Sequence, residues 1–302
     1  MNNRKISIGK KSVYQSEPFL PDSRFMTGFV GRTTELKYIT AAWMAGKNTL
    51  PLSPLLIGEP GVGKNRLVYE LAQKTNRDLY IFQGHEDVTA EDLACSVRFS
   101  DQKKGMMDYM ISPLVTAMYN GGICFIDEIG KIRPRALALL VSVLDERQYI
   151  DSILLGERIQ AHPGFRFIAA TNTTDINLLP EFILSRMRPT IWIDQPLREE
   201  ISQVIRSQYR EMKEEIDNLL GLFWELWHTY EKPGKSLSVR DVIHLFSLAS
   251  NLSAFDSSGG MNNFSVASRD NPFSLSCGEN TRGIQPAHLR MAFDQLFKVE
   301  TL

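Results

Sequence analysis

The chain has 302 residues, of which 43% are hydrophobic and 23% charged, a balance typical of a soluble globular protein. Its length predicts two domains, and its net charge of −1 with no long basic run argues against nucleic acid as a partner. No apolar run is long enough to cross a bilayer, and the basic N-terminus lacks the apolar segment of a signal peptide, so we expect a cytoplasmic protein without membrane contact. The three cysteines have neither metal-ligand spacing nor a plausible disulfide framework.

The first elements predict a strand, a loop and a helix in succession. Residues 1–24 show no clear hydrophobic period and are expected to form a tail or an arm on the surface. A helix follows, with Thr33 or Thr34 as its cap. The apolar run 53–57 predicts a buried strand that ends at glycine, and residues 64–74 carry apolar side chains at helical spacing.

Strands and helices continue to alternate along the next hundred residues. The pattern predicts strands at 78–82, 123–127, 165–170 and 190–193, helices at 109–120 and 134–147, and a hairpin at 149–160. Five strands separated by helices predict an α/β fold built on a doubly wound, parallel five-stranded sheet.

The composition changes after Pro196. Helical periodicity predicts helices at 198–227, 239–251 and 285–298, and residues 253–282 are rich in Ser, Asn and Gly, as in a flexible insertion. We therefore expect a tail at 1–24, an α/β core at 25–196, and a small all-α domain at 197–302 that contains this insertion.

A glycine-rich loop follows the first core strand. It has the pattern G-x-x-x-x-G-K and reads Gly58, Glu59, Pro60, Gly61, Val62, Gly63, Lys64. Glycines let backbone N–H groups converge on phosphate oxygens, the following helix points its positive end at the same anion, and Lys64 is expected to reach the β- and γ-phosphates. A plain turn is the alternative, which the flanking strand and helix and the lysine at this offset disfavour.

Asn65 follows the lysine, where this motif has Ser or Thr. The hydroxyl of that residue normally meets Mg²⁺. The oxygen of a carboxamide can still bind the metal or a metal-bound water, but it lies differently on a longer side chain. We therefore expect Asn65 to be a metal ligand, with reduced Mg²⁺ affinity and turnover.

Polar side chains end two further strands. Asp127 and Glu128 close an apolar strand, where Asp127 is expected to hold Mg²⁺ and Glu128 to act as general base toward water. Asn172 follows the next strand and could orient that water. The alternatives are acids that meet solvent and an asparagine in a turn.

Two arginines are candidates to stabilise transition-state charge. Arg186 precedes the last strand, with Arg188 as an alternative two residues later, and Arg240 begins a helix of the second domain. For each, a surface arginine in a salt bridge is the alternative that the sequence alone favours.

These motifs, in this order, resemble the AAA+ ATPases from about residue 28 to residue 296. More narrowly, the chain resembles the MoxR-like branch, which is related to the AAA domains of dynein and midasin. The stretches that carry this resemblance are Asp92-Leu93, Ser112–Met118, Gly121–Ile129, Leu144–Arg147, Phe167–Asn172 and Ile284–Leu289. Ser112 and Ala94-Cys95 depart from the branch, which usually has Gly at both places.

The resemblance implies roles for individual residues. Asn172 would be sensor 1, Arg186 the arginine finger, Arg240 sensor 2, and Arg32 would flank the adenine pocket. It also implies an α-helical lid and a ring, expected to be a hexamer, because the finger acts on a neighbouring subunit. Segments 97–106 and 149–160 would be the branch's two insertions, which touch a protein client.

We therefore expect an ATPase that uses ATP and Mg²⁺ as a chaperone-like remodeller of a protein partner. The family often acts with a partner that carries a von Willebrand factor A domain. The alternative is a nucleotide-regulated assembly scaffold with little or no hydrolysis, because of Asn65. A DNA motor is disfavoured by the near-neutral charge, and an activator at an alternative sigma factor by the lack of its loop motif.

Overall fold

The computed structural model describes residues 4–21, 29–44, 46, 49–99, 107–230, 237–257 and 283–298. The chain divides into two compact units, Met1–Asp194 and Gln195–Leu302, and each is described by itself. Among the described residues, none of the helices is both long enough and apolar enough to span a membrane.

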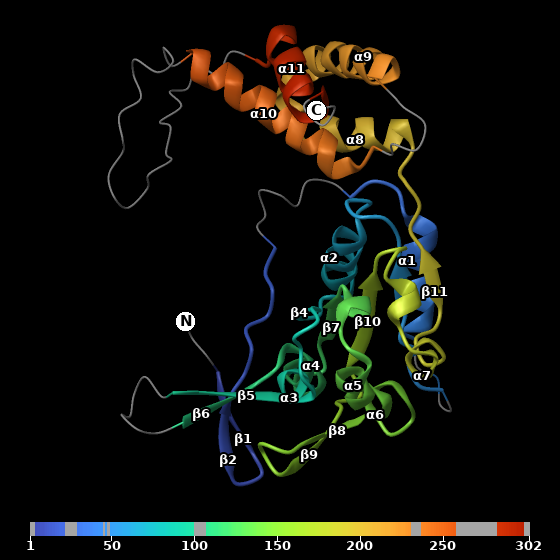
Figure 1. Ribbon diagram of the computed structural model, residues 1–302, viewed down its shortest axis with the longest axis vertical. Helices are drawn as coiled ribbons and strands as arrows, with labels where there is room; N and C mark the ends of the chain where they lie inside the picture. Colours follow the sequence, from blue (N-terminus) through green and yellow to red (C-terminus); the bar gives the residue numbers. More distant parts are fainter. Residues whose placement is uncertain are drawn as a thin grey trace. The chain divides into compact units, whose positions relative to one another are not determined.

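A five-stranded sheet forms the centre of the first unit (Figure 1). Its order is β11 (Thr190–Trp192), β3 (Leu55–Ile57), β10 (Arg166–Thr171), β7 (Ile123–Asp127) and β4 (Leu79–Gln83). All neighbours pair in parallel. The predicted fold class is confirmed, and because the strands are parallel, their carboxyl ends share one edge of the sheet.

Successive side chains of each strand enter opposite layers of the core. Leu56, Phe125 and Ile168 pack in the cluster that includes α1 (Thr33–Ala42) and α2 (Lys64–Thr75). Their neighbours Ile57, Ile126 and Ala169 pack in the cluster that includes α4 (Pro113–Asn120) and α5 (Pro134–Leu137). Burial on both faces explains why these strands read as unbroken apolar runs.

The N-terminal segment is not the surface tail that the sequence predicted. Strands β1 (Lys5–Ile8) and β2 (Lys11–Tyr14) form a hairpin, and β2 pairs in parallel with β6 (Met107–Ile111), which pairs with β5 (Cys95–Phe99). The prediction failed because these strands are four residues long and half polar, and because β2 pairs with a strand more than ninety positions away. Of the expected insertion at 97–106, residues 100–106 lie outside the described part of the chain.

Several predicted helices have different ends. The helix expected from 109 begins at Pro113, because Ser112 caps it and residues 109–111 belong to β6. The helix expected over 134–147 is a series of short turns that ends with α6 (Val141–Leu144). The N-cap of α1 is Arg32 in the left-handed conformation, not Thr33 or Thr34.

The first unit also contains a short helix and a second hairpin. A short helix, α3 (Ala90–Ala94), was not predicted and begins with a capping box between Thr89 and Asp92. The predicted hairpin is present as β8 (Tyr149–Ser152) and β9 (Glu157–Gln160). The loop between these strands accepts a hydrogen bond at Leu154 O from Lys11 Nζ, 2.5 Å away, so the N-terminal hairpin is tied to it.

The second unit is helical, as predicted. It contains α8 (Arg198–Gln208), α9 (Lys213–Tyr230), α10 (Val239–Ser257) and α11 (Pro286–Phe293), which ends in a π-helical turn. Edge-to-face contacts of Phe223 with Phe246 and Phe293 join three of these helices in one core. Helix α10 includes the first five residues of the insertion expected at 253–282, and residues 258–282 lie outside the described part of the chain.

Candidate functional site

The glycine-rich loop connects the carboxyl end of β3 to α2. Gly61 and Gly63 have φ angles of 83° and 101°, a region that favours glycine. A Cβ at Gly58 would lie 2.5 Å from the backbone oxygen of Ile193, so a larger residue would force the backbone to move. Helix α2 has no side-chain cap and no acidic residue in its first turn, which leaves its N–H groups directed at the loop. Together these features make a site for an anion.

Lys64 is 8% exposed, and its ammonium is fully engaged in hydrogen bonds. Nζ donates to the carbonyls of Gly58 and Glu59, at 2.7 and 3.0 Å, and to Asn172 Oδ1 at 3.0 Å. A buried charge requires such partners. The predicted lysine and sensor asparagine are therefore neighbours, because β10 lies beside β3 in the sheet.

Asp127 lies at the same edge and uses both of its carboxylate oxygens. Oδ2 accepts a hydrogen bond from Asn65 Nδ2 at 2.8 Å, and Oδ1 accepts one from the backbone N–H of Glu128 at 3.0 Å. The amide nitrogen of Asn65, and not its oxygen, thus faces Asp127.

Glu128 has two partners that the sequence did not predict. Its Oε2 accepts a hydrogen bond from Gln83 Nε2 at 3.0 Å and forms an ion pair with Lys131 Nζ at 2.8 Å. The hydrogen bond to Glu128 raises the pKa of Lys131. Gln83 pairs in register with Asp127 at the end of β4. A polar residue at the end of an apolar strand was therefore the feature of the sequence that could have identified Gln83 as part of the site.

Two contacts join the loop to neighbouring segments. The Thr173 hydroxyl donates to the Glu59 carboxylate, which ties the loop to the turn after β10. Arg32 has a φ of 59°, and its guanidinium donates to Asp194 O at 2.5 Å and to Glu35 at 3.2 Å. Arg32 thereby holds the start of α1 to the chain beyond β11, and its role beside an adenine stays a prediction.

The residues of this site are better suited to bind a triphosphate than to bind Mg²⁺ directly. The loop supplies convergent N–H groups, and Lys64 supplies a charge whose carbonyl partners can be exchanged for phosphate oxygens. Among the described residues there is no group of three or more acidic, His or Cys side chains placed to hold a metal. Asn65 presents a donor where the motif has an oxygen ligand, which disagrees with its predicted role as a metal ligand.

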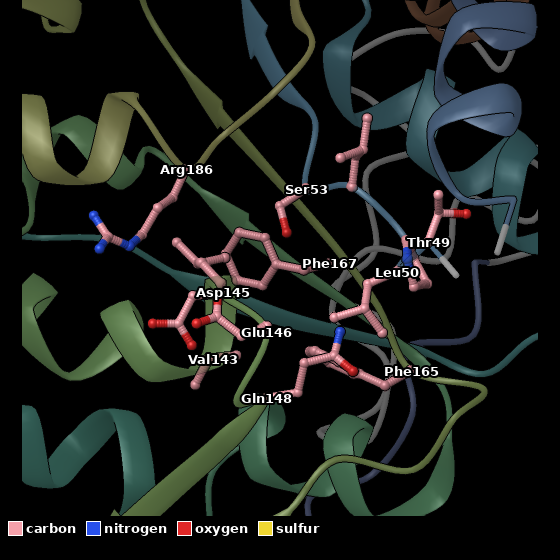
Figure 2. Close-up of a pocket in the computed structure, with 13 residues that line it drawn as sticks. Thr49, Leu50, Ser53, Val143, Asp145, Glu146, Gln148, Phe165, Phe167 and Arg186 are labelled. Atoms are coloured by element: carbon pink, nitrogen blue, oxygen red, sulfur yellow. The ribbon is translucent and has the colours of Figure 1, made fainter. Parts of the chain in front are cut away.

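Arg186 lies at the amino-terminal ends of the strands, opposite to the phosphate loop. It precedes β11 and lines a pocket of about 410 Å³ with residues that precede β3 and β10, among them Ser53 and Phe165. Figure 2 shows the Arg186 guanidinium on the side of Asp145. A hydrogen bond from Arg147, and to a lesser extent the charge of Arg186, lowers the pKa of Asp145.

The Arg186 guanidinium is only partly paired within its own chain. Its Nη1 donates to Phe182 O at 2.7 Å, whereas its buried Nε has no hydrogen-bond partner among the described residues. Arg188, the alternative, is exposed. Arg240 is exposed at the start of α10 in the second unit. The structure therefore brings Lys64, Asp127, Glu128 and Asn172 together and keeps both Arg186 and Arg188 apart from them.

The sequence and the fold match known proteins. The family model of the AAA domain, dynein-related subfamily, matches residues 53–187. An uncharacterized protein of Staphylococcus saprophyticus is 31% identical over 203 residues, which are 65% of this chain and 77% of that protein. The denitrification regulatory protein NirQ of Stutzerimonas stutzeri is 33% identical over 139 residues, 46% of this chain and 47% of its own.

Solved structures share the fold, and one of them serves as an example. The RuvB Holliday junction branch migration motor of Thermotoga maritima superposes with a TM-score of 0.57 and 18% identity, over 90% of this chain and 73% of that one. At this identity the likeness concerns the fold alone. The phosphate loop, the two strand-end acids, the sheet order and the relatives agree. The chain therefore belongs to the AAA+ ATPases, in their dynein-related, MoxR-like branch.

Proposed function

We propose that this chain binds and hydrolyses ATP within a ring of identical subunits and uses the cycle to remodel a protein partner. One observation carries the proposal: Lys64, Asn172, Asp127 and Glu128 meet at one edge of the sheet, around a loop that fits phosphate. NirQ, one of the relatives, is a denitrification regulatory protein, and a regulatory role is part of what we propose for this chain.

The contacts suggest what each side chain does when ATP binds. Phosphate oxygens replace the carbonyls of Gly58 and Glu59 as partners of Lys64, and Asn172 then orients water near the γ-phosphate. Glu128 accepts a proton from that water at Oε1, because its contacts with Lys131 and Gln83 are both made by Oε2. The contacts at Oε2 thus orient the Glu128 carboxylate.

Arg186 supports the ring. The length of strands β3 and β11, on the order of 10 Å or more, lies between Arg186 and the phosphate loop of the same chain. A finger at this edge therefore serves a nucleotide held by a neighbouring copy. A hexamer, a role of Arg240 in sensing the γ-phosphate and a partner with a von Willebrand factor A domain are further parts of the proposal.

The test is the release of phosphate by the purified protein with ATP. Glu128→Gln should lower turnover by about 100-fold or more, the scale of general-base catalysis, and leave nucleotide affinity unchanged. Lys131→Gln, which alters only the partner of the base, is the matched control and should retain turnover. Turnover that survives Glu128→Gln would remove this residue as the base.

A second candidate is a nucleotide-regulated scaffold that assembles on ATP but scarcely hydrolyses it. The hydrogen bond from Asn65 to Asp127 favours it, because this bond occupies the carboxylate oxygen that faces the position of the missing hydroxyl. Asn65→Thr should then raise turnover substantially, whereas unchanged turnover would count against the scaffold.

A further inference from the structure

We propose that Asn65 makes nucleotide binding by this chain nearly independent of Mg²⁺, and that Tyr69 and Phe19 hold Asn65 in the orientation that does so. This inference rests on the proposed binding of ATP at the glycine-rich loop, which both candidate functions share. It does not depend on the rate of hydrolysis.

A hydroxyl and a carboxamide differ in how they can bond a carboxylate and a metal at the same time. A hydroxyl oxygen donates its hydrogen and offers its lone pairs from one atom, so it can bond a carboxylate and bind a metal at one place. A carboxamide splits these roles, with its donors on nitrogen and its acceptor on oxygen. Asn65 keeps the donor role, because its Nδ2 lies 2.8 Å from Asp127 Oδ2. The acceptor is therefore displaced from the position that a metal ligand would need.

We infer that Tyr69 helps to hold the Asn65 amide in this orientation. Tyr69 lies one helical turn after Asn65 on α2, so the two side chains are neighbours on one face of the helix. Burial and the charge of Asp127 raise the pKa of Tyr69, and the Asn65 side chain lowers it, as expected of a phenol beside both groups. A turn of the Asn65 amide would replace its bond to Asp127 by a contact between two oxygens, and the neighbouring Tyr69 ring limits the space in which the amide can turn.

The N-terminal segment packs against Tyr69. The Phe19 ring packs on the Tyr69 ring with their centroids 4.9 Å apart and their planes at 33°. Phe19 is held in turn by its backbone N–H, which donates to Leu79 O at 2.7 Å. The segment is anchored again at Ser16, whose Oγ donates to Ile111 O at 2.9 Å. A segment remote in sequence therefore fixes the residue beside the phosphate loop.

The consequence concerns the ligand that the site prefers. In the motif with Ser or Thr, the metal bridges protein and phosphates, so removing it weakens nucleotide binding. With Asn65 turned toward Asp127, affinity comes from the loop N–H groups, the end of α2 and Lys64, none of which needs a metal. The ligand of this site is then a nucleoside triphosphate with or without Mg²⁺.

The test is equilibrium binding of the fluorescent N-methylanthraniloyl derivative of a non-hydrolysable ATP analogue to the full chain, in EDTA and in excess Mg²⁺. We expect wild-type affinities that agree within about twofold, and Asn65→Ser to bind about tenfold or more tightly with Mg²⁺ than without. A wild type that prefers Mg²⁺ as strongly as Asn65→Ser does would overturn the proposal. Lys64→Ala should weaken binding under both conditions, and if wild type binds under neither, the proposed function fails instead.

The positioning role has its own readout. Tyr69→Phe and Phe19→Ala should free the amide to turn, which raises the Mg²⁺ preference several-fold while affinity in EDTA stays at the wild-type value. Leu20→Ala, at a neighbouring residue that is 81% exposed, is the matched control and should behave as wild type. Variants of Tyr69 and Phe19 that weaken binding equally under both conditions, with a lower melting temperature, would show a merely structural role and overturn this part.

Discussion

Lys64 and Asn172 lie 108 positions apart in the chain, yet Lys64 Nζ donates to Asn172 Oδ1 over 3.0 Å. Such a meeting could be expected, because both residues follow parallel strands of one sheet and the carboxyl ends of these strands share an edge. The direction of a single amide could not, since it depends on which partners surround it. Asn65 donates to Asp127 for that reason, although the sequence predicted a metal ligand.

Cys124 provides a pH test at the scale of one residue. Complete burial raises the pKa of its thiol far above the value of about 8.5 in an unfolded chain. Below pH 8.5 the thiol is protonated in both states and costs nothing. Above it, unfolding releases a proton that the folded state retains, so the free energy of unfolding falls by up to about 1.4 kcal/mol per pH unit.

Urea unfolding between pH 7.5 and 9.5 measures this effect against Cys124→Ala. The cavity in the variant lowers its stability by a constant amount, so only the slopes are compared. We expect the wild type to lose stability more steeply above pH 8.5. Parallel pH profiles would show that Cys124 does not contribute.

Gly58 provides a packing test at the same scale. In Gly58→Ala the new methyl would meet the Ile193 backbone oxygen at 2.5 Å, so we expect a loss of about 1–3 kcal/mol in unfolding free energy. Gly221→Ala in α9 is the control, because no atom lies within 4 Å of its added Cβ, and it should gain up to about 1 kcal/mol. Equal stability of Gly58→Ala and wild type would contradict the close approach.

Elements with strong periodicity or clear end signals were predictable, and weakly patterned ones were not. Strand β7 has the predicted bounds because it is continuously apolar and ends at two acids. The start of α4 was misplaced, although Ser112-Pro113 is a common helix start, because the preceding strand β6 also carries apolar residues. The strands of hairpin β1–β2 have four residues each, and so short a hydrophobic pattern does not predict a strand.

Ser112 makes a prediction at the scale of an element. Its Oγ accepts from Val115 N at 3.1 Å as the cap of α4 and donates to Leu93 O at 2.7 Å. Ser112→Ala should cost about 1–2 kcal/mol of unfolding free energy, because it removes the cap and leaves buried groups unpaired. Thr89→Ala, at the exposed cap of α3, should cost less in the same denaturant titration. A larger loss at Thr89 would refute this reading.

The arrangement of Arg186 and Lys64 makes a prediction for the whole molecule. Because they lie at opposite edges of one sheet, a site assembled in a ring takes Lys64 from one subunit and Arg186 from its neighbour. Lys64→Ala and Arg186→Ala should each abolish phosphate release when pure. Mixed together, they should recover part of it, since some interfaces then carry both intact residues.

The mixing experiment has an internal control. Lys64→Ala mixed with Glu128→Gln should recover nothing by this route, because both residues lie on the same side of the interface. Recovery in this second mixture, or none in the first, would contradict an arginine that acts on a neighbouring subunit.

The sequence by itself determined the phosphate loop, the strand-end acids, the parallel sheet and the helical second unit, because each is indicated by a pattern of residues close together in the chain. Only the tertiary structure decided that the N-terminal segment pairs with β6, and that Phe19 packs on Tyr69 beside Asn65. These contacts join residues about 50 to 100 positions apart, and their energy comes from packing and hydrogen bonds that no local pattern encodes.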